Sequence, residues 1–198
     1  MKKINELPNF NDIYDQISFE EHSSIEKKTS IMVMLILIGR QLSYRTSLSE
    51  ENKGILYQNK RIGEFEGVIA TLDDEILIKS HSDAIKAALL IDCIWFKNGR
   101  LMPAVMEIEH STGVTSGLSR MKNFYDRFPP FPTRYVIVAP DEIRHKVVQE
   151  ANKPQFKSLN SKYFPYSAVE ELYALCQKRK LKGVTEDFLD CYMESIVN

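Results

Sequence analysis

Residues 91–120, which read IDCIWFKNGRLMPAVMEIEHSTGVTSGLSR, contain the pattern that decides the fold. Two short apolar runs flank Asn98 and Gly99, the dipeptide that best fits a two-residue type I′ hairpin turn. We therefore predict an antiparallel hairpin over these residues. With a two-residue turn, the numbers of opposed residues sum to 197, so that Asp92 faces Val105.

Three acidic residues of this hairpin are expected on one face. Side chains alternate along a strand with period two, and opposed residues of an antiparallel pair point to the same side. Asp92, Glu107 and Glu109 then share a face, with Asp92 and Glu107 as diagonal neighbours whose β-carbons lie roughly 5–8 Å apart. Carboxylates at this spacing can share one cation. Hard oxygen ligands favour Mg²⁺ or Mn²⁺ over zinc, so the spacing predicts a magnesium or manganese site.

The sequence leaves a second interpretation of these acids open. Carboxylates on strands are usually exposed and solvated, and such residues bind nothing. Here the neighbouring residues are apolar, which indicates a buried strand, and buried acids need a cation or a set of hydrogen-bond donors. Pro103 cannot donate a ladder hydrogen bond, so it indicates an edge position or a bulge. A one-residue slip in register would turn the acids apart.

These residues resemble a known motif. An Asp at the end of one strand, Glu-x-Glu on the next strand and then a helix resemble the PD-(D/E)xK nuclease superfamily. The string VMEIEHSTGVTSGLSRM is similar to a bacterial restriction-endonuclease-like group with an E-[VI]-E-H-[ST]-[ST] signature. RYVIVAPDEIRHKV, KPQF and YFPYSAVEELY follow in that group's order, so the resemblance covers about residues 20–180. The sequence departs from the superfamily's commonest form at Glu109, where a Lys is usual.

The resemblance implies an α/β fold with a restriction-endonuclease-like αβββαβ core, a mixed sheet flanked by helices on both faces. It implies a Mg²⁺- or Mn²⁺-dependent endonuclease that hydrolyses double-stranded DNA in the manner of type II restriction enzymes. Asp92 and Glu107 would be catalytic metal ligands. Glu109 would either ligate a second ion or accept the proton of the attacking water. Cleavage of both strands by one small domain calls for a homodimer.

The missing Lys also supports a different class of function. Glu109 lacks the positive charge that Lys lends to the transition state, and the whole chain has a formal net charge of −1. The alternative is therefore a catalytically inactive DNA-binding or assembly subunit of a defence or DNA-processing complex.

The helix expected after the hairpin supplies two candidate substrate-binding residues. Its apolar positions begin at Val114 and recur at helical spacing, and Ser111 or Thr112 is the expected cap. Ser116 and Arg120 lie on its polar stripe, in places that resemble those beside the active site in the superfamily. Arg120 can hold a phosphate through its planar fork. A solvated surface arginine is the alternative.

The rest of the chain predicts one domain over residues 1–198, with a variable segment over residues 48–88 in which target recognition is expected. A capping box at residues 23–26 predicts a helix from near Ser24 to near Leu42. Strands are expected at residues 43–47, 135–139 and 163–164, and helices at residues 10–17, 141–151, 168–178 and 186–196.

Composition agrees with a compact protein of the cytoplasm. Of the 198 residues, 43% are hydrophobic and 27% are charged, which is ordinary for one globular domain. The near-neutral charge counts weakly against nucleic acid, although a local basic patch would suffice for DNA. Three cysteines without a C-x-x-C pair predict reduced thiols. The N-terminus lacks the apolar core of a signal peptide, and no apolar run approaches the roughly 20 residues of a membrane span.

Overall fold

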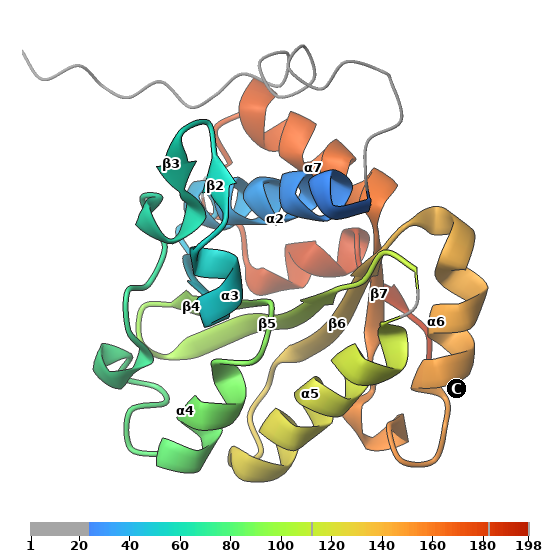
Figure 1. The fold of residues 1–198 in the computed structure, drawn as a ribbon. Coiled ribbons are helices and arrows are strands. Elements are labelled where there is room, and N and C mark those ends of the chain that lie inside the picture. The colour runs from blue at the N-terminus through green and yellow to red at the C-terminus, as the bar shows by residue number, and fades with distance from the viewer. Residues whose placement is uncertain (1–23, 112, 182, 198) are drawn as a thin grey trace, which may run out of the picture.

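A computed structural model describes residues 24–111, 113–181 and 183–197, and its centre is a six-stranded mixed sheet (Figure 1). The strand order is β1-β4-β5-β6-β7-β8, with β5, β6 and β7 parallel to one another and the remaining neighbours antiparallel. The predicted mixed α/β architecture is confirmed. The strands are β1 (Arg45–Leu48), β4 (Cys93–Lys97), β5 (Leu101–Ile108), β6 (Arg134–Ala139), β7 (Lys162–Pro165) and β8 (Glu194–Ser195).

Helices cover both faces of this sheet, as predicted (Figure 1). Alternate residues of β5 show the division, because Met106 packs with α2 and α7 while Val105 packs with α4, α5 and α6. Each face therefore has its own apolar core. The helices are α2 (Ser24–Gln41), α3 (Glu50–Lys53), α4 (Ser82–Ala88), α5 (Val114–Arg127), α6 (Arg144–Ala151) and α7 (Tyr166–Lys178).

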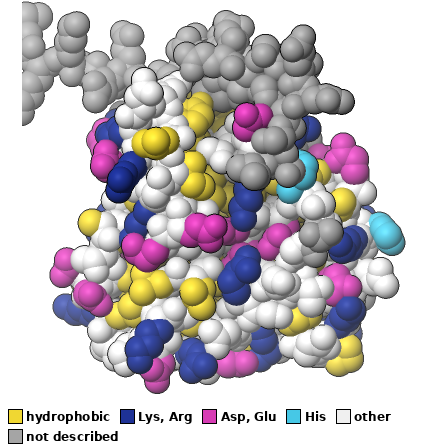
Figure 2. Space-filling view, in the orientation of Figure 1, with side chains coloured by type: hydrophobic (Ala, Val, Ile, Leu, Met, Phe, Trp, Pro, Cys, Tyr) yellow, Lys and Arg dark blue, Asp and Glu magenta, His cyan; other side chains and the backbone are white. Residues whose placement is uncertain are grey.

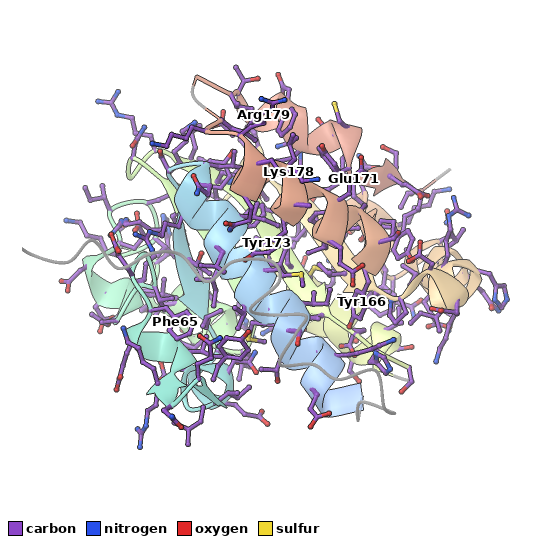
Figure 3. All side chains as sticks on the ribbon, turned by 90° about the horizontal axis from the view of Figure 1, so that it is seen from above. Phe65, Tyr166, Glu171, Tyr173, Lys178 and Arg179 are labelled. Atoms are coloured by element: carbon purple, nitrogen blue, oxygen red, sulfur yellow. The ribbon has the colours of Figure 1, made fainter. Side chains whose placement is uncertain are left out.

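The apolar run over residues 31–38 lies within α2, and every one of these residues is buried. A helix that is apolar on all sides must be covered on all sides. One side of α2 meets the sheet and another meets α7, and the two helices lie side by side when the molecule is seen from above (Figure 3). Tyr173 of α7 is fully buried in the same core as α2.

The hairpin turn forms as predicted. Asn98 and Gly99 both have positive φ, 54° and 62°, which is the requirement of a type I′ turn. The amide of Arg100 donates to the carbonyl of Lys97 at 3.1 Å.

The predicted register of the hairpin is wrong by two residues. The ladder shifts between Trp95 and Lys97, and beyond this irregularity Ile94 pairs with Val105, a sum of 199 instead of 197. Asp92 is therefore one step beyond the Cys93–Met106 pair, opposite Glu107 and not diagonal to it. Side chains alternate with period two, so a shift of two residues leaves each side chain on its original face. The three acids therefore keep their common face.

Pro103 accounts for this irregularity. It precedes Ala104, where the parallel pairing of β5 with β6 begins, and it lies opposite the shifted part of β4. A residue without an N–H is tolerated there because neither neighbouring strand needs its hydrogen bond. Pro103 was expected either on an edge strand or at a bulge. The bulge is observed, since β5 lies in the interior of the sheet.

Most other predicted elements are confirmed, but the last helix does not form, and the N-cap of α5 is Gly113 instead of the expected Ser111 or Thr112. Residues 48–88 contain α3, a small hairpin of β2 (Leu56–Tyr57) and β3 (Lys60–Arg61), and α4. The helix expected over residues 186–196 is wrong, because a 3-10 helix over Glu186–Cys191 is followed by β8, which pairs with β7. The helix expected over residues 10–17 lies outside the described residues. Among the helices that the structure does describe, none has the length and apolarity to cross a membrane.

Candidate active site

The three acids of the hairpin lie at one end of the sheet, where β4 begins and β5 ends. Asp92 directly precedes β4, Glu107 is in β5 and Glu109 follows it. The Oδ2 atom of Asp92 accepts a hydrogen bond from the amide of Ile108 at 3.0 Å, which joins Asp92 to the strand that carries both glutamates. All three side chains are buried, with relative exposures of 6% for Asp92, 0% for Glu107 and 8% for Glu109. The interpretation that they are solvated surface carboxylates is therefore wrong.

Asp92 is held by two residues that the sequence did not single out. Nζ of Lys28 lies 3.0 Å from Oδ2 of Asp92, and Nδ2 of Asn52 donates to Oδ1 at 2.8 Å. Lys28 comes from the start of α2 and Asn52 from α3. Together with the amide of Ile108, they give the Asp92 carboxylate three donors from three different segments.

Glu107 and Glu109 share one arginine. Nε of Arg120 donates to both carboxylate oxygens of Glu107, at 3.0 and 3.1 Å, and Nη2 also donates to Glu107. The same Nη2 donates to Oε1 of Glu109 at 3.2 Å. Arg120 thus bridges the two glutamates with the planar fork that was expected to bind phosphate. Ser116, the other predicted substrate-binding residue, is exposed on the same helix.

Burial is the largest influence on the pKa values of Glu107 and Glu109. It raises the pKa of Glu107 well above its usual value, and the nearby charge of Asp92 raises it further, against the hydrogen bond from Arg120. Burial also raises the pKa of Glu109, while the charges of Lys28 and Arg120 lower it. The hydrogen bond from Arg120 to Glu107 raises the pKa of the guanidinium and so favours its charged form. The site therefore has a strong requirement for positive charge.

Two glycines let α5 approach the acids closely. A β-carbon at Gly113 would lie 1.9 Å from Oε2 of Glu109, a separation that no side chain permits. A β-carbon at Gly117 would lie 2.9 Å from Oε1 of Glu109 and 3.0 Å from Cβ of Glu107. The first turn of α5 consequently rests against the carboxylates, and the positive end of its dipole favours their charge.

The donor atoms suit a hard divalent cation, because all three side chains offer carboxylate oxygen. Among the described residues, however, the structure contains no group of three His, Cys, Asp or Glu side chains that could hold a metal ion. The ammonium of Lys28 and the guanidinium of Arg120 occupy the positions beside the carboxylates. Both side chains are 33% exposed, so each of the two cations is reached by solvent.

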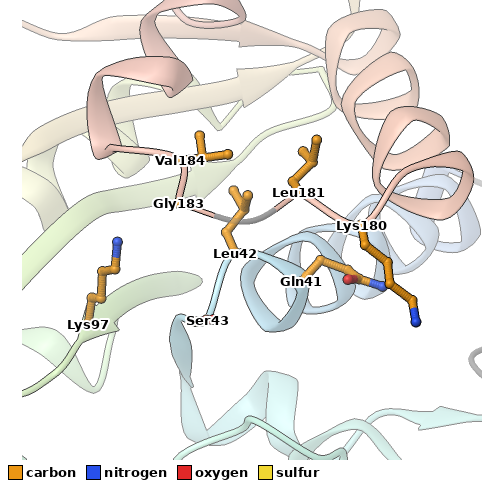
Figure 4. Close-up of a pocket in the computed structure, with 8 residues that line it drawn as sticks. All are labelled: Gln41, Leu42, Ser43, Lys97, Lys180, Leu181, Gly183 and Val184. Atoms are coloured by element: carbon orange, nitrogen blue, oxygen red, sulfur yellow. The ribbon is translucent and has the colours of Figure 1, made fainter.

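One cavity of the described structure lies away from these acids. It has a volume of about 570 Å³ and is lined by residues such as Leu42, Lys97 and Val184 (Figure 4). Lys97 ends β4 at the hairpin turn, whereas Asp92 precedes the first residue of that strand. At about 3.3 Å per residue, five strand residues separate the cavity from the acids by roughly 16 Å. The cavity is therefore no substrate pocket for these carboxylates.

The charged surface around the sheet is mixed in sign. Figure 2 shows Lys and Arg side chains interspersed with Asp and Glu near the middle of the face that it draws. This agrees with the near-neutral net charge of the sequence. A partner of high negative charge would consequently be attracted by local groups and not by a broad positive field.

Comparison with known proteins identifies relatives of this chain. A family model described as the C-terminal domain of the type II restriction enzyme NmeDI matches residues 7–196. The type II restriction enzyme NmeDI of Neisseria meningitidis serogroup C is 52% identical over 203 residues, which cover 98% of this chain and 58% of that enzyme. The chain thus spans little more than half the length of this curated relative. No solved structure matches the present chain.

Proposed function

This chain belongs to the NmeDI C-terminal domain family, and we propose that it is a metal-dependent endonuclease that hydrolyses phosphodiester bonds in double-stranded DNA. The relative named a type II restriction enzyme supports this class of activity, although the chain corresponds to 58% of its length. The observation that carries the proposal is that three buried carboxylates lie at the end of neighbouring strands: Arg120 joins Glu107 to Glu109, and Asp92 accepts from the amide of Ile108 between them. Buried acids are retained where a cation or substrate uses them.

We also propose that the core is that of the PD-(D/E)xK superfamily. Leaving out the segment between β1 and β4, the order is α2, β1, β4, β5, α5 and β6, which is the αβββαβ pattern. The three β-strands are antiparallel neighbours, and α5 makes the crossover from β5 to the parallel strand β6. The acids lie where β5 leads into that crossover.

In this proposal Asp92, Glu107 and Glu109 hold Mg²⁺ or Mn²⁺. Such an ion, when bound, supplies Lewis acidity to the phosphate and lowers the pKa of a nearby water. Asn52 and the amide of Ile108 keep the Asp92 carboxylate oriented. Arg120, freed from the glutamates, neutralises phosphate charge. Where Glu109 does not itself bind the ion, it is placed to accept the proton of the attacking water.

A cleavage assay on a long phage DNA, which contains many potential target sites, tests this function. We expect fragments with Mg²⁺ or Mn²⁺ and none with a chelator. Asp92→Asn should abolish cleavage, while Asp126→Asn should not, because Asp126 is exposed on α5 and pairs with Lys122. Intact DNA with either ion and folded wild-type protein would refute the proposal.

The second candidate is a catalytically inactive DNA-binding or assembly subunit. The observation that favours it is that Lys28 and Arg120 already neutralise the acids without an ion. Mg²⁺ titration by calorimetry, beside a DNA mobility-shift assay with chelator, separates the two candidates. DNA binding without any heat of Mg²⁺ binding would support the inactive subunit.

Three further proposals follow from the endonuclease function. Cleavage of both strands requires two sites, so we propose a homodimer, which light scattering after size exclusion measures. We place target recognition in residues 48–88, where α3 brings Asn52 to the acids and the β2–β3 hairpin leaves Lys60 and Arg61 exposed. We also propose that the protein works in the cytoplasm, where such a function meets DNA.

A further inference from the structure

Lys28 reaches the acids from a helix that is otherwise built for the core. Residues 31–38 of α2 are all buried, whereas Lys28, near the start of the same helix, is one-third exposed and directed at Asp92. Its Nζ atom lies 3.0 Å from Oδ2 of Asp92. Its charge also acts on the more distant Glu109, whose pKa it lowers against the effect of burial. The ammonium therefore lies within the acid cluster.

The charges of the site suggest that Lys28 binds phosphate. In the proposed reaction an ion at Asp92 displaces the Lys28 ammonium from that carboxylate, and the phosphodiester brings a new anionic acceptor into the site. A site that binds phosphate among these acids needs positive charge directed at the phosphate. Position 109, next to the phosphate in the proposed reaction, is a glutamate and offers none.

Arg120 and Lys28 differ in how readily they can supply that charge. Arg120 is engaged by both glutamates through Nε and Nη2. Among the residues that the structure describes, Lys28 has one ion-pair partner, Asp92, and its ammonium has three N–H donors. Its flexible four-carbon stem lets the ammonium move several ångströms while α2 stays anchored in the core.

We propose that Lys28, held at the acids by Asp92, is a catalytic residue of this site that binds the scissile phosphate. It pairs with Asp92 while the site holds no ion, and it donates to a non-bridging oxygen of the scissile phosphate once an ion binds Asp92. Lys28 acts only as a hydrogen-bond donor and forms no covalent bond. This inference rests on the proposed endonuclease function.

The test compares Lys28→Met, which removes the charge and keeps the stem, with Lys28→Arg, which keeps the charge. Lys27→Met is the matched control, because Lys27 is the exposed neighbour on the same helix. Cleavage rate and the Mg²⁺ concentration at half-maximal thermal stabilisation are measured for each folded variant. Melting without ion reports any purely structural effect.

We expect Lys28→Met to slow cleavage by about 100-fold or more, as for other lost transition-state donors. Its Mg²⁺ midpoint should fall by about 3-fold or more, because no ammonium competes for Asp92. Lys28→Arg should retain more activity than Lys28→Met, and Lys27→Met should match the wild type in both measurements.

Two results overturn the inference, and they differ from failure of the proposed function. If Lys28→Met melts lower but cleaves at the wild-type rate with an unchanged Mg²⁺ midpoint, Lys28 is structural and the endonuclease proposal stands. If the folded wild type neither cleaves nor responds to Mg²⁺, the endonuclease proposal fails and the assignment of Lys28 fails with it.

Discussion

The guanidinium of Arg120 lies across the fully buried carboxylate of Glu107, with Nε 3.0 and 3.1 Å from its two oxygens. This contact joins the middle of α5 to the strand that carries the acids. It also explains how a carboxylate with no exposed surface is tolerated, since a buried charge needs both a counter-ion and hydrogen bonds. The same arginine is consequently a structural partner in the ion-free protein and a candidate phosphate ligand in the reaction.

Substitution of Arg120 should therefore destabilise the ion-free protein, independently of any effect on catalysis. We expect Arg120→Ala to lower the free energy of unfolding by about 2–3 kcal/mol, because Glu107 loses its buried partner. Arg120→Lys should lose about half as much, since it keeps the charge and loses the fork. Urea unfolding in chelator measures both. Arg127→Ala is the control, because its Nε bonds only to the side chain of Asn123 on an exposed surface, and an equal loss there would contradict the prediction.

Asp92 should stabilise the ion-free protein in addition to serving any ion. Asp92→Ala leaves the amide of Ile108 and the side chains of Lys28 and Asn52 without their acceptor. We expect a loss of about 2–3 kcal/mol in the absence of Mg²⁺, because unsatisfied buried donors are costly. The wild type should gain melting temperature with Mg²⁺ and the variant should not. Equal gains in both proteins would exclude Asp92 as an ion ligand.

The stability of the ion-free protein should depend on pH through Glu107. Burial raises its pKa above the usual 4.5, so the folded protein binds this proton more tightly than the unfolded chain. Its contribution is fully present below the unfolded value and is lost as pH rises through the raised folded value. We expect chelated protein to lose stability as the pH rises above the usual glutamate value, and Glu107→Gln to flatten this dependence. Thermal melts across this pH range check the sign, and a wild-type dependence unchanged by Glu107→Gln would contradict it.

The contact of α5 with the acids should not tolerate a β-carbon at Gly117. Alanine favours an isolated helix by about 1 kcal/mol over glycine. Here, however, its β-carbon would lie 2.9 Å from Oε1 of Glu109, and such overpacking costs about 1–3 kcal/mol. We expect a net loss of stability and a weaker Mg²⁺ response in Gly117→Ala.

Gly54→Ala is the control for this substitution. Its new β-carbon would meet its nearest neighbour, the carbonyl of Glu51, at 3.4 Å, an ordinary contact. Its urea midpoint should stay near the wild-type value. A Gly117→Ala protein as stable as the wild type would show that α5 can retreat from the acids at no cost.

For the hairpin, local sequence pattern predicts the turn and the faces of the side chains but not the register. Asn98 and Gly99 determine the turn, and alternation determines that Asp92, Glu107 and Glu109 share a face. The register of opposed residues was not predictable, because Pro103 and the bulge beside it add a shift that turn chemistry does not report. The common face survived because the error was an even number of residues.

The partners of the acids were beyond local pattern. Lys28 and Asn52 stand 64 and 40 residues before Asp92, and neither belongs to a recognisable motif. One signal was available for Lys28, a charged residue close to the start of a helix whose next turns are uniformly apolar. The last segment was mistaken for a helix because pairing with β7 overrides its local propensity at Glu194 and Ser195.

By itself, the sequence determined the α/β class, the hairpin and the face of the three acids. These depend on backbone stereochemistry and on side-chain alternation, which act between near neighbours of the chain. The tertiary structure alone decided that Arg120 bridges the glutamates and that Lys28 and Asn52 hold Asp92. Those contacts depend on how α2, α3 and α5 dock around the end of the sheet, and docking is determined by the packing of whole apolar surfaces and by the charge that three buried carboxylates require.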